Sequence, residues 1–403
     1  MNFLPPALNS AGIGPDGSVN RASFSEADLE CRAWFAARAQ ELALTFEVDR
    51  NGNQWAWWED HLSGTALVMG SHLDSVPDGG RWDGPLGVVA AFAAVEELRA
   101  RGFTPTRPIA VVNFMEEEGG RFGLACLGSR LMTGAVDGSR ALALADRDGV
   151  TLERAMVAAG LDASRVGADP DRVRRIGAFV EPHIEQGHLP VADAAGTVRG
   201  LAAAGAPLGV LTEIWAHGRW RIDIPGTPNH AGTTALDDRD DPVLTMARGI
   251  LLVREVAQEL GVLATVGKVS VVPGAVNAIA SLATMWVDAR GANAEKVPEV
   301  AERVASALES SAILESWTPA TRFDGALSDA LAAAAQRASG VPAPRLPSGA
   351  GHDSGVLAEA GVPAAMLAVR NLDGTSHAAA EHADDADAFH AVTTLVELVA
   401  ALS

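Results

Sequence analysis

Short apolar runs alternate with helical patterns in the first third of this 403-residue chain. Residues 65–70 and 109–115 have the length and composition of buried strands, and residues 86–101 between them have helical spacing that ends at Gly102. A further helix is expected at residues 121–132. Because strands that alternate with helices at this spacing usually pair in parallel, the pattern predicts an α/β fold with a mostly parallel sheet.

The pattern changes after about residue 209. Alternation and apolar runs predict strands, and helical spacing predicts helices, in this order: 220–224 (strand), 241–260 (helix), 264–272 (strand), 281–290 (strand) and 295–308 (helix). Helices packed on one side of an antiparallel sheet would form a separate α+β domain.

The last part of the chain returns to the first type of pattern. From about residue 323 an alanine-rich helix is followed by a short strand at residues 364–369 and then by a loop that carries a histidine. We therefore predict a discontinuous α/β domain made of residues 1–209 and 322–403. Residues 210–321 would be inserted into it as an α+β lid or dimerisation domain.

The formal net charge is −20 and the pI calculated from the sequence is about 4.8. An acidic surface repels phosphate backbones and anionic lipids, so neither nucleic acid nor a membrane is expected as a partner. A small anionic substrate is not excluded, because a few buried arginines can set the local field.

The two cysteines, Cys31 and Cys126, are too few for a disulfide scaffold or a thiolate zinc site. Residues 1–20 lack the basic and apolar segments of a secretory signal, and the longest apolar stretches fall short of a membrane span. We therefore expect a cytoplasmic protein whose thiols are reduced.

Histidine and carboxylate residues follow the predicted strands of the first domain. His72 and Asp74 close the first strand, and the Asp74 carboxylate could accept a hydrogen bond from the His72 imidazole. Asp83 lies on a glycine-flanked turn, where a carboxylate could bridge two cations. Three adjacent glutamates, residues 116–118, follow the second strand, and keeping them together is costly unless cations or protons neutralise them.

Two further histidines complete the set, His183 in residues 181–187 and His377 in residues 374–377. A single histidine at a strand end is more often a structural polar residue, but ligands of open α/β sheets bind beyond the carboxyl ends of strands. Nitrogen and carboxylate ligands without sulfur suit Zn²⁺, with Mn²⁺, Co²⁺ and Ni²⁺ as alternatives. Spacing alone does not decide which of the three adjacent glutamates would bind a metal.

Over nearly the whole chain these segments resemble the hydantoinase/carbamoylase branch of the di-zinc exopeptidase-like amidohydrolases. That branch includes N-carbamoyl-L-amino acid hydrolases, allantoate amidohydrolases and one lineage of β-ureidopropionases. Its recurring patterns are GSHxDSVxxGGxxDGxxGV, EEGxRF, ExHIEQG, NHAGTTP, and SGAGHD followed by GxSH. They correspond here to residues 70–76 with 79–88, 117–122, 181–187, 229–234, 348–353 and 374–377.

The resemblance implies a site for two divalent metal ions. His72 and His183 would bind one ion, and Glu118 and His377 the other. Asp83 would bridge the two ions. The family pattern, through the glycine after Glu118, selects that glutamate from the three.

The resemblance also implies the reaction, which is hydrolysis of the C–N bond of a small N-carbamoyl amino acid to the amino acid, CO₂ and ammonia. Metal ions would polarise the ureido carbonyl and activate a water molecule. Glu117, as general base, would take the proton of that water and deliver it to the leaving amine. Asp74 would act from outside the metal ligands, by orienting His72.

Five residues are expected to contact the substrate or its transition state. His230 resembles the family histidine that stabilises the developing oxyanion, often from the partner subunit. Asn277 and Arg290 match positions that hold the substrate carboxylate, and an arginine fork suits that grip. A surface salt bridge remains the alternative for Arg290, and a plain turn residue remains the alternative for Asn277. Gln186 and Gly351 would line the pocket.

Two segments depart from the family pattern. Ala235 and Leu236 follow NHAGTT, where relatives commonly have Pro-Met, and residues 369–371 (Val-Arg-Asn) replace an apolar-Val-Pro stretch. Arg370 could contact a second acidic group or be a scaffold residue. The metal set is intact, but the departures leave the identity of the substrate open.

Other functions compete with carbamoyl hydrolysis. An allantoate amidohydrolase would use the same residues on a diureido acid. The HIEQG and NHAGTT motifs disfavour a peptidase or an acyl-amino acid deacylase, and retention of the base and the five ligands disfavours a non-catalytic binding protein. The strand-rich insert has an edge that could pair across a two-fold axis, so we expect a homodimer.

Overall fold

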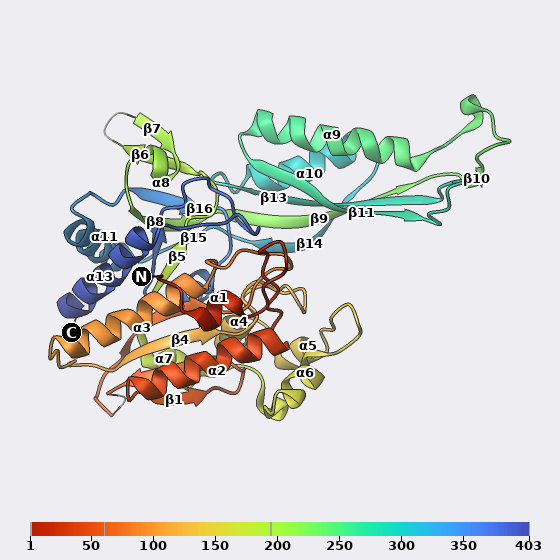
Figure 1. The fold of residues 1–403 in the computed structure, drawn as a ribbon. Coiled ribbons are helices and arrows are strands. Elements are labelled where there is room, and N and C mark those ends of the chain that lie inside the picture. Colours follow the sequence, from red (N-terminus) through yellow and green to blue (C-terminus); the bar gives the residue numbers. More distant parts are fainter. Residues whose placement is uncertain (1, 60, 194–195, 403) are drawn as a thin grey trace. The chain divides into compact units, whose positions relative to one another are not determined.

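The computed structural model describes residues 2–59, 61–193 and 196–402 (Figure 1). The chain divides into two compact units, Met1–Glu213 with Arg322–Ser403, and Ile214–Thr321. The first unit contains a mostly parallel sheet between helices, and the second contains an antiparallel sheet with its own helices. The predicted fold class is therefore confirmed. None of the helices in the described ranges is both long and apolar enough to span a lipid bilayer.

The sheet of the first unit has its sequentially distant strands side by side. The order across the sheet is β1 (Thr45–Val48), β2 (Gln54–Trp58), β4 (Ile109–Phe114), β3 (Ala66–His72), β5 (Ile176–Ile184), β17 (Ala364–Val369), β8 (Leu208–Ile214) and β15 (Thr321–Arg322). A further strand, β16 (Arg345–Ser348), pairs with β8. Strands β3, β4, β5 and β17 pair in parallel, whereas β1, β2 and β8 join antiparallel.

The central strands lack polar–apolar alternation because both of their faces are covered. Every residue of β3, β4 and β17 is buried. The sheet forms one hydrophobic core with the helices α2 (Glu26–Glu41), α3 (Pro85–Ala100), α11 (Gly325–Ser339) and α13 (Asp385–Leu402). Strand residues outside that core, such as Val68 and Val112, are buried as well. Helix α3 packs tightly on β5 because it has Gly87 at the contact, where an added Cβ would lie 2.1 Å from the carbonyl oxygen of Pro182.

The helices of the first unit are mostly short, apart from α2, α3, α11 and α13. The hairpin β6 (Pro190–Asp193) and β7 (Gly196–Arg199) and the 3₁₀ helix η1 (Ala163–Arg165) complete the unit. The helices are α1 (Pro6–Ser10), α2 (Glu26–Glu41), α3 (Pro85–Ala100), α4 (Leu127–Thr133), α5 (Gly138–Leu142), α6 (Leu152–Ala158), α7 (Pro170–Arg175), α8 (Gly200–Ala203), α11 (Gly325–Ser339), α12 (Asp353–Glu359) and α13 (Asp385–Leu402).

The helix predicted at residues 121–132 was wrong in its first half, because α4 begins only at Leu127. The preceding residues fold around the buried carboxylate of Glu116 instead. Its Oε1 atom accepts hydrogen bonds from the backbone N–H groups of Arg121 (2.9 Å) and Phe122 (2.6 Å). This local acceptor outcompetes the helical pattern.

The second unit is a four-stranded antiparallel sheet in the order β11 (Leu263–Val272), β13 (Leu282–Gly291), β9 (Ala216–Pro225) and β14 (Ala312–Thr318). Helices α9 (Pro242–Leu260) and α10 (Lys296–Ala307) lie on one face of the sheet and form a second hydrophobic core with it (Figure 1). The alternating burial of β9 follows from this one-sided cover. A second, two-stranded sheet joins β10 (Asn229–His230) to β12 (Ala278–Ile279), and the 3₁₀ helix η2 (Leu236–Asp238) follows β10.

Candidate metal centre

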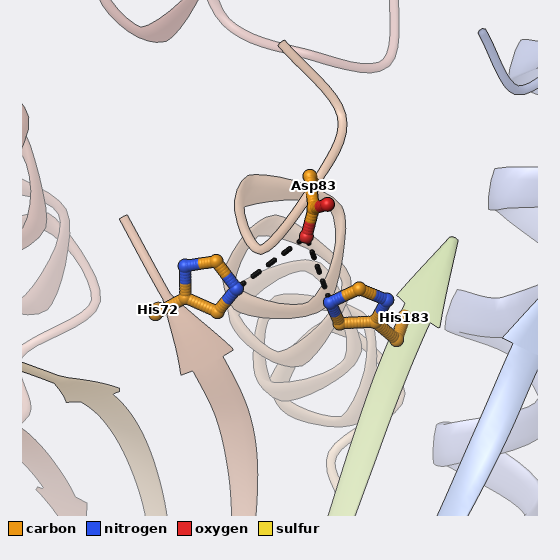
Figure 2. Close-up of side chains that lie close together, drawn as sticks. All are labelled: His72, Asp83 and His183. Atoms are coloured by element: carbon orange, nitrogen blue, oxygen red, sulfur yellow. Dashed lines mark ion pairs between the residues drawn. The ribbon is translucent and has the colours of Figure 1, made fainter. Parts of the chain in front are cut away.

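His72, Asp83 and His183 place ligand atoms within 4.8 Å of one another (Figure 2). His72 is the last residue of β3, and His183 is the second-last of β5. Asp83 lies in the loop before α3, two residues before the first helical residue. Its Oδ1 atom lies 3.0 Å from Nε2 of His183 and 3.5 Å from Nε2 of His72.

A second group shares Asp83 with the first. Asp83, Glu118 and His377 also place ligand atoms within 4.8 Å of one another. Nε2 of His377 lies 3.4 Å from Oδ2 of Asp83 and 3.4 Å from Oε2 of Glu118. Each oxygen of the Asp83 carboxylate therefore serves a different group, and the five side chains fall into the grouping predicted from the family pattern.

The sheet explains why these distant residues meet. Strands β3, β4, β5 and β17 run parallel, so their carboxyl ends share one edge. His72 and His183 lie on two of these ends. Glu118 follows β4, and His377 follows β17.

Backbone carbonyls orient the two buried imidazoles. Nδ1 of His72 lies 3.1 Å from the carbonyl oxygen of Asp74, and Nδ1 of His183 lies 2.9 Å from that of Ile184. Each ring therefore donates its Nδ1–H to a carbonyl oxygen and directs Nε2 to the centre.

The Asp74 carboxylate has a different role from the one predicted. It lies 3.6 Å from Nδ1 of His72, farther than the Asp74 carbonyl, which is the hydrogen-bond acceptor of that ring. Its two oxygens accept the backbone N–H groups of Glu117 (3.1 Å) and Glu118 (3.2 Å). Asp74 thus holds the backbone that carries the candidate base and the candidate ligand.

Glu117 lies beside the first group, with Oε2 3.7 Å from Nε2 of His72. Its Oε1 atom accepts a hydrogen bond from the thiol of Cys126 at 3.4 Å. Burial, together with the charges of Asp353 and Glu118, raises the pKa of the Glu117 carboxyl well above its usual range. A carboxyl with a raised pKa next to a metal centre suits a group that accepts and returns a proton.

The residues fit divalent cations on the chemistry of the donor set. Burial and the charges of Asp83 and Asp74 raise the pKa of Glu118 well above its usual range. Its Oε1 atom is buried and lacks a hydrogen-bond partner within the described part of the chain. Positive charge at this position would offset the repulsion and satisfy that oxygen.

Asp83 and His183, in contrast to Glu118, favour each other's charged forms. Burial alone would raise the pKa of Asp83, but the charges of His183 and His72 hold it well below its usual range. Burial alone would lower the pKa of His183, but Asp83 raises it to about 9. A metal ion that binds here must therefore displace a proton from His183.

The three adjacent glutamates differ in their surroundings. Glu116 is fully buried and belongs to neither metal-binding group, because its carboxylate accepts the backbone N–H groups of the loop before α4. Glu117 and Glu118 face the centre. Geometry thus separates the three residues, which spacing alone did not.

Two of the predicted pocket residues lie in the first unit. Gln186 Nε2 donates to Oδ2 of Asp83 at 2.7 Å and lies 3.4 Å from Nε2 of His377. Gly351 is exposed and immediately precedes His352.

Arg370 donates to Oδ2 of Asp387 at 2.8 Å, and Asp387 is almost fully buried. Of the two alternatives for Arg370, this contact favours a scaffold residue.

A small cavity beside His183 has mainly apolar walls. Its volume is about 20 Å³, room for roughly one water molecule. His352 is buried beside it, and the rings of His352 and His183 meet edge to face at 4.7 Å. The apolar lining residues are Ile184, Leu189, Leu211, Leu346, Pro347, Met366 and Ala368.

The three substrate residues predicted in the second unit do not all lie together. His230 and Asn277 are neighbours, because the N–H of Ala231 donates to the carbonyl oxygen of Asn277 at 3.0 Å. Arg290 pairs with His217 near the start of β9, whereas His230 follows the far end of that strand. At about 3.3 Å per residue, the eight steps from His217 to the end of β9 span roughly 26 Å.

The side chains of His230 and Arg290 have defined local partners. Nδ1 of His230 accepts the N–H of Gly232 at 3.0 Å, which places the proton of the neutral ring on Nε2. That proton could be donated to a developing oxyanion. Arg290 is half-buried and donates to Oδ1 of Asp288 through Nε (2.9 Å) and Nη2 (2.6 Å). The salt bridge that was the alternative for Arg290 is therefore present.

Comparison with known proteins identifies the family. The family model described as "Peptidase family M20/M25/M40" matches residues 68–401, most of the chain. An N-carbamoyl-L-amino acid amidohydrolase of Geobacillus stearothermophilus is 34% identical over 389 residues, which cover 93% of this chain and 91% of that protein.

The chain belongs to the hydantoinase/carbamoylase branch of the M20 family.

Other members of the branch cover the chain equally well. A ureidoglycolate hydrolase of Oryza sativa subsp. japonica is 32% identical, with 98% of this chain and 83% of that protein covered. An allantoate amidohydrolase of Bacillus subtilis (strain 168) is 31% identical, with 93% and 90% covered. The crystal structure of a hydantoinase/carbamoylase family amidase from Burkholderia vietnamiensis superposes with a TM-score of 0.85 at 29% identity and covers 98% of this chain and 94% of that one.

Membership of the M20 family makes this chain a metal-dependent hydrolase that acts on non-peptide C–N bonds. The relatives differ in substrate, and their identities to this chain lie within a few per cent of each other.

Proposed function

We propose that this M20 amidohydrolase cleaves the carbamoyl C–N bond of a small N-carbamoyl amino acid. The observation that carries the proposal is the Asp83 carboxylate shared by two ligand groups, with Glu117 beside them. A site of this kind suits two divalent ions per subunit, of which Zn²⁺ fits the nitrogen and oxygen ligands best and Mn²⁺, Co²⁺ or Ni²⁺ are alternatives.

A ureido carbonyl resists attack because both nitrogens donate into it. Two divalent ions, when bound, would supply the Lewis acidity that polarises this carbonyl and lowers the pKa of a water molecule. Glu117 then accepts the proton of the attacking water and returns it to the leaving nitrogen. Its raised pKa supports this transfer, because burial and the neighbouring carboxylates make the Glu117 carboxylate a stronger proton acceptor than an exposed glutamate.

The cavity beside His183 supports a small substrate, because its volume of about 20 Å³ leaves no room for a large side chain. It adjoins a ligand of the first group, and its aliphatic lining residues favour an apolar over a charged group at that position. Arg290 supports an anionic substrate that displaces Asp288 from the guanidinium, because a guanidinium binds a carboxylate through two parallel hydrogen bonds. Allantoate and ureidoglycolate remain the alternative substrates.

The separation of His230 from Arg290 supports a homodimer. Arg290 pairs with His217, which lies roughly 26 Å along β9 from the strand end that precedes His230, so a small substrate is not expected to contact both residues within one subunit. If His230 of one subunit completes the site of its partner, each site receives both residues. Strand β11 supports the assembly, because it is an edge strand whose residues are mostly exposed, including Leu263, Val269 and Val272.

A substrate panel on metal-loaded enzyme tests the proposal. Ammonia release would be measured with N-carbamoyl-L-amino acids of increasing side-chain size, allantoate, ureidoglycolate and a dipeptide, and amine release would be measured for the dipeptide. We expect the highest kcat/KM for an N-carbamoyl amino acid with an apolar side chain. Faster turnover of allantoate or ureidoglycolate would reject the substrate, and turnover of the dipeptide alone would reject the reaction class.

A further inference from the structure

Glu381 connects the two loops that carry Asp83 and His377. It is 2% exposed, and its two carboxylate oxygens each accept a backbone N–H group. Oε1 accepts the N–H of Asp83 at 2.9 Å, and Oε2 accepts the N–H of His377 at 3.2 Å. The buried Glu381 side chain thus links Asp83, which both groups share, to His377 of the second group.

The loop that carries Asp83 is shaped to receive this carboxylate. A Cβ atom added at Gly80 would lie 2.3 Å from Oε1 and 2.6 Å from Cβ of Glu381. Such a distance is far inside van der Waals contact, so a side chain at residue 80 would displace Glu381. The absence of a side chain at Gly80 allows the contact.

The two ligand groups differ in how firmly their histidines are held without Glu381. His72 and His183 are 1% and 2% exposed, they lie within strands, and a carbonyl oxygen orients each ring. His377 lies in a loop after β17, its side chain is 47% exposed, and its backbone has a φ of 58°. Non-glycine residues rarely adopt this left-handed conformation, which must be maintained by the surroundings.

We propose that Glu381 is a positioning residue that holds His377 in register with Asp83, and that it thereby sets the affinity of the second metal-binding group. The inference rests on the proposed two-metal function. Loss of the Glu381 carboxylate weakens the group of Asp83, Glu118 and His377 far more than the group of His72, Asp83 and His183. The reason is that Asp83 keeps its contacts with two buried histidines, whereas His377 loses the acceptor of its backbone N–H.

Metal titration of metal-free protein tests the proposal without any substrate. Glu381→Gln keeps the size of the side chain but leaves one oxygen to accept two N–H groups, and Glu381→Ala removes both acceptors. Gly80→Ala displaces the Glu381 side chain but leaves its carboxylate unchanged. Glu397→Gln is the matched control, since Glu397 is a surface carboxylate paired with Arg337. His377→Ala, which removes a second-group ligand, shows which equivalent belongs to that group.

Zn²⁺ would be titrated in competition with a chelating indicator, and folding would be checked by circular dichroism. We expect the dissociation constant of the metal ion bound by the second group to rise about 10- to 100-fold in Glu381→Gln. Loss of a residue that positions a metal ligand commonly weakens metal binding by this amount. The dissociation constant of the ion bound by the first group should change less than about threefold. Both dissociation constants of Glu397→Gln should match those of the wild type. Glu381→Ala and Gly80→Ala should also raise the dissociation constant of the ion bound by the second group.

Equal weakening of both equivalents would show that Glu381 only supports the general fold, and unchanged affinities would remove its role altogether. Either result overturns the proposal. If Glu381→Ala does not fold, the conservative Glu381→Gln and the independent Gly80→Ala still decide. A wild-type protein that binds two ions but hydrolyses no ureido acid rejects the proposed function and leaves this inference standing. Variants that bind like an active wild type reject only the inference.

Discussion

Asp83 and His183 form a buried ion pair in which Oδ1 of the carboxylate lies 3.0 Å from Nε2 of the imidazole. The other oxygen of Asp83 faces His377 at 3.4 Å. One carboxylate therefore serves both ligand groups, while each histidine serves one. Loss of Asp83 should therefore affect both groups, whereas loss of one histidine should affect only one group.

Asp83→Ala should abolish stable binding of both metal ions, whereas His377→Ala should abolish one. The reason is that the first variant removes a ligand from each group and the second removes a ligand from a single group. Metal content per chain would be measured by elemental analysis after dialysis. Retention of one tightly bound ion by Asp83→Ala would contradict a shared ligand.

Glu117→Gln should retain both metal ions and lose about 10²- to 10⁴-fold in kcat, since an amide cannot accept the proton of the attacking water. The hydrogen bond from Cys126 can still be accepted by the amide oxygen, so the fold should be unaffected. Metal content and steady-state kinetics measured on the same preparation would separate these effects. Near-normal turnover would exclude Glu117 as the base.

A mixture of His230→Ala and Arg290→Ala subunits should recover activity that neither variant has alone. In a mixed dimer, one site receives Arg290 from its own chain and His230 from the partner, while the other site lacks both. Random reassociation should therefore restore about a quarter of wild-type activity for a two-fold symmetric dimer. Activity after co-refolding would be the measurement, with each variant refolded alone as the control. If no activity returns, the two residues do not come from different subunits.

Arg370→Met should lower stability and leave substrate preference unchanged. The substitution leaves the buried Asp387 carboxylate without its partner, at a cost of roughly 1–3 kcal/mol. Thermal unfolding and kcat/KM across the substrate panel would be compared with the double variant Arg370→Met/Asp387→Leu, which removes both charges and should regain stability. A changed substrate preference in the single variant would instead assign Arg370 to the pocket.

Asp28→Asn should make the stability of the protein less dependent on pH. Burial raises the pKa of Asp28 to about 6, so the native state holds this proton more tightly than the unfolded chain does. Its contribution is therefore present below about pH 4 and is lost as the pH rises through about 6.

The unfolding free energy of the wild type should consequently fall more between pH 4.5 and 7.5 than that of Asp28→Asn, by on the order of 2 kcal/mol. Denaturant unfolding at the two pH values gives this difference. Asp329→Asn, at an exposed carboxylate paired with Arg345, is the control and should parallel the wild type. Equal slopes in Asp28→Asn and the wild type would refute the linkage.

The parts of the centre that could be predicted from sequence are those that the parallel sheet positions. His72 closes β3 and His183 lies near the end of β5, so recognition of the strands sufficed to bring the residues together. Periodicity could not show that Glu116 turns away from Glu117 and Glu118, because three adjacent residues share one strand end. The family pattern distinguished them, and the backbone N–H groups of Arg121 and Phe122 give the physical reason.

Contacts between distant segments were beyond the reach of the sequence. Glu381 contacts Asp83, 298 positions away, and nothing in the local pattern around either residue indicates the contact. The carbonyl oxygen of Asp74, rather than its carboxylate, orients His72, and backbone atoms leave no mark on the sequence. The separation of His230 from Arg290 likewise depends on the register of β9 with β13.

The chain leaves the first unit at the end of β8 and returns through β15, and these two strands are hydrogen-bonded neighbours in the sheet. Residues 214–321 thus form a connection between two adjacent strands in the sheet of the first unit, the parent sheet. The pairing of these two strands does not depend on what the connection contains. A short turn in place of this connection would close the same sheet, and all five candidate ligands and Glu117 would remain on the shortened chain. Such a minimal protein would separate the ability to hold metal, which needs only the parent sheet, from the ability to choose and turn over a substrate.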